Sequence, residues 1–180
     1  AGIINMSFGS LAESFTLELA LQYAYNTSVL VAAAGNDRRG LDPCSTGYCK
    51  PMYPAAYNFV LGVQDLPPPI LGYSNYDLTG PIFTYYTAKL LNYELFAPGT
   101  NIMSTIPNGG YAALTGTSMS TPLVAGGLAL YRELKPTDSK ELIFGTLIRY
   151  DENNELIWWN FVDFLHTIEV EPSPRLCVIS

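Results

Sequence analysis

The sequence predicts an α/β fold built on a parallel sheet, because two buried strands and a helix between them follow one another near its start. Apolar runs at residues 2–8 and 28–34 each predict a buried strand, the first ending at Gly9-Ser10. Between them, apolar residues recur at the spacing of one helical face, at Leu17, Ala20, Leu21, Ala24 and Tyr25. Strand, helix and strand at this spacing form a βαβ unit, whose two strands run parallel.

The composition describes a globular chain with a sizeable core. Of the 180 residues, 48% are hydrophobic and 14% are charged, which excludes a disordered chain and suits one domain. The net charge of −7, without a cluster of Lys or Arg, argues against nucleic acid and anionic membranes as partners. No apolar run reaches the roughly 18 residues of a transmembrane helix. The chain opens on a strand without Met or a basic leader, so we expect no signal peptide and a longer parent protein.

The functional interpretation depends on the stretch from Gly116 to Leu130, where small residues lead into a serine and an apolar run follows a proline. Pro122 lacks an N–H group and is tolerated only in the first turn of a helix, so the helix should begin near Thr117 or Ser118. Because the helix is apolar nearly all round, we expect it to be buried, with the Gly-Gly pair at 126–127 allowing close packing.

Ser118 would then lie at the N-terminus of this helix. Free N–H groups and the helix dipole favour negative charge there, which suits a serine nucleophile that forms a tetrahedral oxyanion. The alternative is that Ser118 only caps the helix, as many serines before helices do.

The segment Gly116-Thr117-Ser118-Met119-Ser120-Thr121-Pro122 closely resembles the active-serine motif of the subtilisin-like serine peptidases (subtilases). The family's nucleophile maps onto Ser118. The resemblance implies a three-layer α/β subtilisin-like fold with a mostly parallel sheet, and a secreted serine endopeptidase that acts on protein or peptide substrates through an acyl-enzyme.

A second match concerns the end of the strand at 28–34. Ala32-Ala33-Ala34-Gly35-Asn36 resembles the subtilase segment that supplies the oxyanion-hole asparagine, which gives this role to Asn36. A neutral amide donor complements the N–H of Ser118, and loss of such a donor in a subtilisin costs about 10²–10³ in kcat. From the residues alone, Asn36 and Asp37 after a glycine are also ordinary turn residues, and we expect Asp37 to be solvated.

The resemblance also implies substrate-binding residues. Ser7-Phe8-Gly9 matches the strand end that pairs with bound peptide and walls the primary specificity pocket, and Ala34 and Gly35 belong to the same binding region. Ser10 stands where many family members have a second glycine. Recognition of a peptide by strand addition uses backbone groups, so the side chains at these positions are only weak evidence for a binding role.

Further segments follow the family's order along the chain. They are Tyr53-Pro54-Ala55 with the strand after it, the turn Tyr73-Ser74-Asn75-Tyr76, the turn Ala97-Pro98-Gly99 between two short strands, and Trp158 to Asp163. The resemblance therefore covers residues 1–168, as the later portion of a catalytic domain whose N-terminal part is missing. Residues 169–180 predict the start of a linker to an absent C-terminal region.

The other members of the family's catalytic triad have no match. Family triads run Asp, His, Ser in chain order, but the sole histidine, His166, follows Ser118 and is expected to be structural. The aspartates before the serine are expected in loops and match no triad motif: Asp37, Asp42, Asp65 and Asp77. We therefore expect this chain alone to be inactive. The competing hypothesis is a non-catalytic subtilase-like domain for peptide binding or assembly.

The cysteines give no metal motif. Cys44 and Cys49 lie in a polar loop with a glycine between them, where a local disulfide suits an exported protein, and Cys177 is left over. Zinc binding by these three cysteines with His166 matches no known spacing. We expect no metal and no cofactor in this chain, and calcium binding is left open for the full-length parent.

The strand at 2–8 is expected to present an unpaired edge. Ile3, Ile4, Met6 and Phe8 put apolar groups on both of its faces, without the lysine, proline or bulge that usually protects an edge. We therefore expect self-association through this strand. The alternative is a monomer with a rearranged N-terminus.

Overall fold

The core of the fold is a parallel sheet of four strands. The structure is a computed structural model, and it describes residues 2–37, 51–66, 74–75, 93, 95–140, 149–150 and 156–157. The strands are β1 (Ile3–Met6), β2 (Val29–Ala33), β3 (Leu61–Leu66) and β4 (Leu95–Pro98), in this spatial order. Each neighbouring pair is parallel, with Ile3 opposite Val29, Val31 opposite Leu61, and Val63 opposite Leu95. The predicted α/β fold with a mostly parallel sheet is confirmed.

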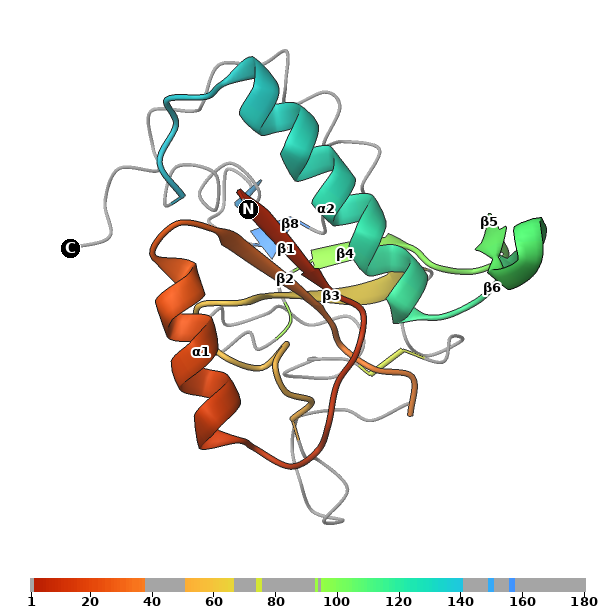
Figure 1. Cartoon of the computed structure of the whole chain (residues 1–180), viewed down its shortest axis with the longest axis horizontal. Coiled ribbons are helices and arrows are strands. Elements are labelled where there is room, and N and C mark those ends of the chain that lie inside the picture. Colours follow the sequence, from red (N-terminus) through yellow and green to blue (C-terminus); the bar gives the residue numbers. More distant parts are fainter. Residues whose placement is uncertain are drawn as a thin grey trace.

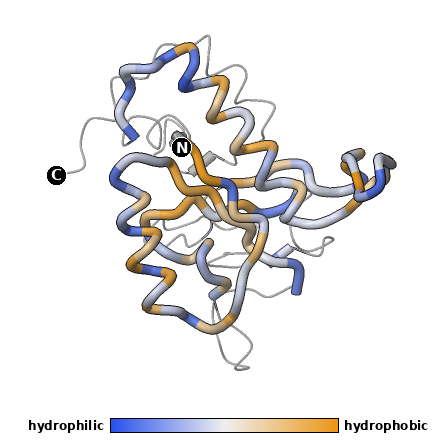
Figure 2. The backbone as a smooth tube through the Cα atoms, viewed as in Figure 1, coloured by the Kyte–Doolittle hydropathy of each residue, from blue (hydrophilic) through white to orange (hydrophobic). Residues whose placement is uncertain are grey.

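Helices cover the two faces of this sheet, which makes three layers (Figure 1). α1 (Phe15–Tyr25) connects β1 to β2, and α2 (Thr117–Leu134) lies across the opposite face. All five residues of β2 are buried, and they alternate between the layers. Val29 and Val31 belong to the cluster under α2, whereas Leu30 and Ala32 belong to the cluster on the α1 side. Figure 2 shows the hydrophobic residues concentrated along these strands.

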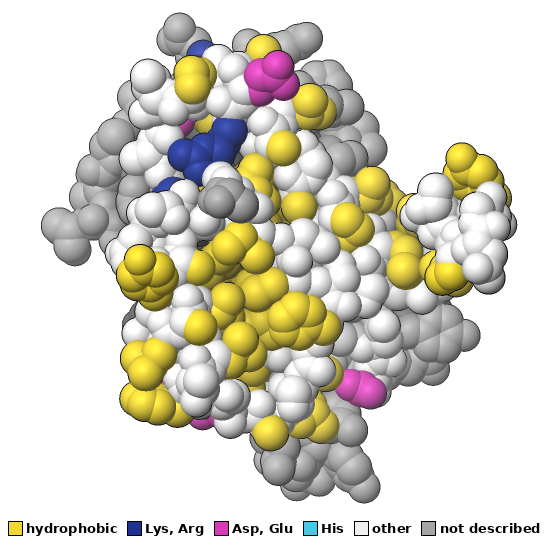
Figure 3. All heavy atoms as spheres, viewed as in Figure 1, with side chains coloured by type: hydrophobic (Ala, Val, Ile, Leu, Met, Phe, Trp, Pro, Cys, Tyr) yellow, Lys and Arg dark blue, Asp and Glu magenta, His cyan; other side chains and the backbone are white. Residues whose placement is uncertain are grey.

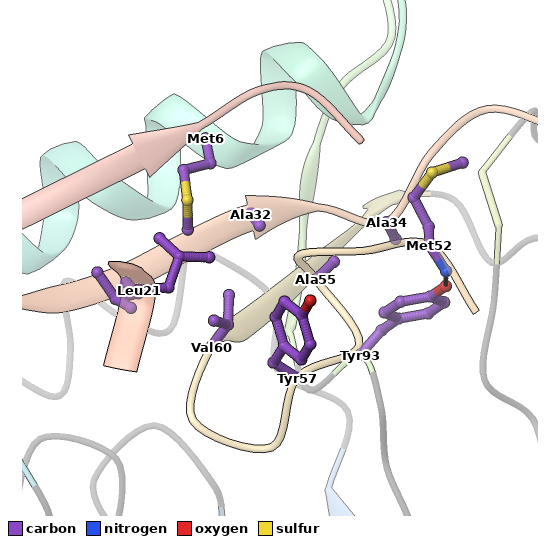
Figure 4. Close-up of a cluster of buried hydrophobic side chains, with 10 residues drawn as sticks. Met6, Leu21, Ala32, Ala34, Met52, Ala55, Tyr57, Val60 and Tyr93 are labelled. Atoms are coloured by element: carbon purple, nitrogen blue, oxygen red, sulfur yellow. Dashed lines mark hydrogen bonds between the residues drawn. The ribbon is translucent and has the colours of Figure 1, made fainter. Parts of the chain in front are cut away.

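The two hydrophobic clusters draw on different parts of the chain. On the α2 side, strand residues pack against Val124, Leu128 and Tyr131 of the helix. On the α1 side, the cluster extends from Leu21 through residues of the segment before β3 to Tyr93, as Figure 4 shows. Ser14 caps α1, since its Oγ accepts a hydrogen bond from the N–H of Leu17.

Helix α2 begins at Thr117, as predicted, with Gly116 as the residue before it. The expectation that it is buried all round is wrong. One face packs on the sheet, but Leu130, Leu134 and Gly126 are exposed. A methyl group added at Gly126 would meet no atom within 4 Å, so close packing does not explain this glycine. A sheet buries only one stripe of the helix above it, and no described segment covers the other side.

Two short antiparallel pairs complete the described structure. β5 (Ile102–Ile106) and β6 (Gly110–Leu114) form a hairpin that projects from the body of the molecule (Figure 1). The 3-10 turn Pro107–Gly109 joins them, with positive φ at Asn108 and Gly109. β7 (Arg149–Tyr150) pairs with β8 (Leu156–Ile157). No described helix is long and apolar enough to cross a membrane.

Some expectations need correction, and others lie outside the described residues. The first strand is shorter than residues 2–8, because pairing with β2 ends at Met6. Asp65 lies in β3 and is buried, so its expected place in a loop is wrong. The structure does not describe Asp42, Asp77, His166 or the three cysteines. It does not describe residues 158–180 either, so the boundary after residue 168 stays a prediction.

Candidate active site

Ser118 is the second residue of α2 and lies beside the end of β1. Its Oγ donates a hydrogen bond to the carbonyl oxygen of Ser7 at 3.2 Å. The Ser7 Oγ in turn donates to the carbonyl oxygen of Ser118 at 3.0 Å. The N-cap position is held by Gly116, which makes no side-chain cap, so the alternative that Ser118 only caps the helix is wrong.

A glycine is required just before the helix. Gly116 has φ +150°, outside the range that residues with a side chain adopt readily. A Cβ there would lie 2.9 Å from Nδ2 of Asn36, so a side chain would displace the amide. The Gly116 N–H donates to the carbonyl oxygen of Gly99 at 2.8 Å, which attaches this turn to the end of β4. Because Gly116 has no side chain, the Asn36 amide can lie against the turn that precedes Ser118.

Asn36 has a fixed orientation beside Thr117, the residue before Ser118. Its Oδ1 accepts hydrogen bonds from the backbone N–H of Thr117 at 2.9 Å and from the Thr117 Oγ1 at 3.1 Å. A backbone N–H can only donate, so the amide oxygen must face Thr117 and the NH₂ group must face away. The Nδ2 donates to no acceptor within the described part of the chain, and the residue is exposed. Asn36 thus offers an amide donor at the N-terminus of α2.

Thr117 connects α2 to the end of β2, although no role was predicted for it from the sequence. The side chain is fully buried, and its Oγ1 accepts from the N–H of Gly35 at 3.1 Å while it donates to Asn36. The signal that could have identified it is its position immediately before Ser118 in the motif.

Asn75 is a second residue whose role was missed. It is buried and binds the segment after β2 with four hydrogen bonds, of which the longest runs from its Nδ2 to the Asp37 Oδ2 at 3.5 Å. Its N–H donates to the carbonyl oxygen of Gly35 at 2.7 Å, its Nδ2 donates to Ala34 at 2.9 Å, and its Oδ1 accepts from the N–H of Asp37 at 3.0 Å. Asp37 is exposed, as expected. The turn motif around Ser74-Asn75 was the available signal.

The predicted substrate-binding residues lie around Ser118 in two backbone segments, at the ends of β1 and β2. Ser7 contacts Ser118 directly, and Gly35 is joined to Thr117. Phe8 is exposed, whereas the Ala34 side chain is completely buried, so Ala34 offers only its backbone. The structure brings these segments together, and their roles in binding stay predictions.

The buried carboxylate of Asp65 lies beside the turn that follows β4. Asp65 Oδ2 accepts a hydrogen bond from Thr100 Oγ1 at 2.9 Å. A Cβ on Gly99 would lie 2.7 Å from Asp65 Oδ1 and closer still to the buried Ser120 Oγ. Gly99 is therefore the residue that lets β4 approach α2.

Among the described residues, no three acidic, His or Cys side chains gather to hold a metal ion.

Comparison with known proteins agrees with this geometry. The profile of the subtilase family matches residues 1–156. The chain belongs to the subtilase family. It is 36% identical over 135 residues to subtilisin BL of Lederbergia lenta, which covers 75% of this chain and 43% of the relative. It is 38% identical over 133 residues to an intracellular serine protease of Paenibacillus polymyxa, covering 73% of this chain and 36% of that protein.

Among solved structures, sphericase superposes with a TM-score of 0.63 at 32% identity. The match covers 81% of this chain and 47% of sphericase. The three-layer subtilisin-like fold inferred from the motifs is therefore confirmed. This subtilase chain spans less than half the length of each of these relatives.

Proposed function

We propose that Ser118 is the nucleophile of a serine endopeptidase whose general base and orienting acid come from outside these 180 residues. One observation carries the proposal. At the N-terminus of α2, the Asn36 amide is bonded through its oxygen to Thr117, the residue before Ser118, and its NH₂ group donates to no acceptor within the described residues. Family membership supports serine endopeptidase chemistry.

In the proposed reaction, Ser118 Oγ attacks the carbonyl carbon of a peptide bond while the base takes its proton. The oxyanion that forms accepts hydrogen bonds from the Ser118 N–H and the Asn36 Nδ2, and the α2 dipole favours its charge. The C–N bond then breaks, and the leaving amine receives the proton from the base. Water hydrolyses the acyl-enzyme and restores the Ser118 hydroxyl.

The chain by itself provides no base at Ser118 within the described residues. The partner of the Ser118 hydroxyl is a backbone carbonyl, which accepts a hydrogen bond but takes no proton at neutral pH. An alcohol becomes a useful nucleophile only beside a general base. We therefore propose that the isolated chain is inactive and that a segment outside it supplies the histidine and aspartate.

The peptide substrate is proposed to lie along residues 7–9, with residues 34–35 on its other side. These segments end two parallel strands. The N–H groups of Ala34 and Gly35 are already bonded within the fold, so the proposed strand addition uses the backbone of Phe8 and Gly9.

The deciding experiment is an assay of the full-length parent with a peptide substrate. Turnover that Ser118→Ala abolishes supports the proposal. The competing non-catalytic domain predicts a parent that binds peptide without turning it over. The parent's preceding sequence distinguishes the two as well, since a peptidase needs an Asp-Gly pair after a strand and a His-Gly-Thr-like motif there.

We also propose that the 180-residue chain self-associates through the β1 edge. Within the described residues β1 pairs only with β2, and its other edge has no strand neighbour. Large apolar side chains are exposed on the segment after β1 and on α1: Phe8 at 58%, Phe15 at 72% and Tyr23 at 81%. Figure 3 shows hydrophobic side chains gathered on the face that carries β1 and α1. An unprotected edge with apolar surface around it favours pairing with a second copy.

For the parent protein we propose a secreted location. The close pair Cys44 and Cys49 suits an oxidising compartment. Fractionation of the source cells tests this, and recovery in the cytosol, as the name of the intracellular relative would suggest, contradicts it.

A further inference from the structure

The tip of the β5–β6 hairpin contains Asn108 and Gly109, and both residues have positive φ, 68° and 79°. Asparagine and glycine adopt this conformation at little cost, so an Asn-Gly pair favours a tight turn between two strands. Asn108 is also the one asparagine of the chain that a glycine follows. The turn therefore places a side-chain amide next to a backbone N–H whose own residue has no side chain to shield it.

Both groups lie in open space. Asn108 is exposed, and its side chain makes no hydrogen bond within the described residues. A Cβ added at Gly109 would meet no atom within 4 Å. No described neighbour therefore shields the amide or restrains the glycine that follows it.

The hairpin has little support from the rest of the fold, from which it projects (Figure 1). Ile106 pairs with Gly110 and Thr105 pairs with Tyr111, so Ile106 and Tyr111 lie on opposite faces of the hairpin. Both of these side chains are exposed, at 37% and 73%. A two-stranded hairpin with both faces exposed is marginally stable, so its tip opens at little cost in free energy.

We propose that Asn108 is a site of spontaneous deamidation. The Gly109 nitrogen attacks Cγ of the Asn108 side chain and loses its proton, and the amide nitrogen leaves as ammonia, so that a cyclic succinimide forms. Water then opens the ring at either carbonyl and leaves aspartate or β-linked isoaspartate at position 108. Ring closure requires the ψ angle of Asn108 to rotate from its value of 23°, which opening of the turn allows. The reaction consumes only water and does not depend on the proposed peptidase function.

Deamidation changes both the charge and the backbone of the hairpin. Residues 95–131 contain no Asp, Glu, Lys, Arg or His, so either product brings the first charge into this segment. Isoaspartate also adds one carbon atom to the backbone of the turn. The two strand pairs next to the turn, Ile106 with Gly110 and Thr105 with Tyr111, then cannot both keep their register. The modification therefore disrupts the hairpin that leads into α2.

The test incubates the 180-residue chain at mildly alkaline pH and follows each asparagine by peptide mapping and mass spectrometry. We expect Asn108 to be converted to aspartate and isoaspartate at a rate within about tenfold of that in a free peptide of residues 104–112, because the turn opens readily. Asn101 is the matched internal control. It is exposed and has positive φ (55°), but the branched side chain of Ile102 hinders the nitrogen that would attack it. Asn101 should keep its amide.

Two variants separate the chemistry from its consequence. Asn108→Gln should stay unmodified, because its longer side chain would have to close a larger ring. Asn108→Asp carries the charge of the product on an ordinary backbone, so the backbone amide NMR signal of Tyr111 should move much less in this variant than in the isolated isoaspartate form.

Three results would overturn the proposal. The first is an Asn108 that outlasts the free peptide by much more than about tenfold, which would show that the turn does not open. The second is loss of the Asn101 amide as fast as that of Asn108, which would remove the role of the Asn-Gly turn. The third is an isoaspartate form whose Tyr111 signal matches that of Asn108→Asp, which would show that the hairpin keeps its register.

Discussion

Ser7 and Ser118 are separated by 111 residues in the chain, yet each donates its hydroxyl to the other's backbone carbonyl, at 3.0 and 3.2 Å. The pair joins the end of the first strand to the first turn of α2. Because the hydrogen bonds run in both directions, the position of Ser118 depends on the end of β1 as well as on its own helix. Ser7 Oγ also accepts from the Asn5 side chain at 3.1 Å, which orients it further.

Ser7→Ala should therefore destabilise the fold. It removes the hydroxyl that donates to Ser118, and a partly buried hydrogen bond contributes about 0.5–1.5 kcal/mol. Denaturant unfolding measures the change in free energy. Ser104→Ala is the control, since Ser104 is exposed on β5 and its loss should stay within about 0.5 kcal/mol. Equal effects of the two substitutions on the free energy of unfolding would show that the Ser7–Ser118 pair does not stabilise the fold.

The isolated chain should not react with a fluorophosphonate. Labelling requires an activated serine, and in a subtilisin the loss of the triad base costs about 10⁶ in kcat. Mass spectrometry after incubation measures the adduct on Ser118. Rapid labelling that Ser118→Ala prevents would show that the chain already holds a base, and the proposal of an external base would be wrong.

Asn36→Leu in the full-length parent should lower kcat by about 10²–10³ and change KM little. The amide donor is proposed to bind the oxyanion, which exists only in the transition state and the tetrahedral intermediate. Steady-state kinetics separates the two constants. Asn58→Leu is the matched control, because Asn58 is exposed before β3 and should leave both constants unchanged. A rise in KM alone for Asn36→Leu would contradict the oxyanion role.

Alanine at two glycines should have opposite effects on stability. Gly99→Ala places a Cβ 2.7 Å from both Asp65 Oδ1 and the Gly116 carbonyl oxygen, so we expect a loss of about 1–3 kcal/mol or more. Gly126→Ala adds a methyl group to an exposed helix position with no atom within 4 Å, so we expect a gain of about 0.4–1 kcal/mol. Thermal unfolding of both variants measures this. A stable Gly99→Ala protein would mean that β4 and α2 can separate without cost.

The sequence predicted the elements whose signals are local. The start of α2 follows from Pro122, and β2 follows from an unbroken apolar run that both layers bury. The exposed side of α2 could not be predicted, because apolar composition does not say which stripe of a helix meets the sheet. The end of β1 could not be predicted either. There Ser7 no longer pairs with β2 and instead forms a hydrogen bond with Ser118, 111 residues along the chain.

The same distinction applies to the candidate site. Ser118 and Asn36 were predicted as site residues because each lies in a recognisable run of residues. Thr117 and Asn75 fix the site through hydrogen bonds between distant segments, and no periodicity in the sequence reports such bonds. Met52 contacts Gly9 and Gly35 only because the chain folds back between the two strands. A methionine before a turn carries no local signal of that position.

The proposed self-association makes the last prediction. At micromolar concentration the 180-residue chain should scatter light as a dimer or larger species, because no described strand pairs with the outer edge of β1 and apolar side chains are exposed on the same part of the chain. Ile4→Lys places a charge on this strand and should shift the chain toward the monomer. Since Ile4 also packs against the α1-side cluster, Phe8→Lys is the second variant, as its side chain is exposed and leaves the core intact. Leu134→Lys is the control, because this exposed leucine lies at the end of α2, away from β1 in the sequence. Its substitution should leave the molar mass measured by light scattering unchanged. A monomeric unchanged chain, or association that persists in both Ile4→Lys and Phe8→Lys, would rule out the β1 edge as the interface.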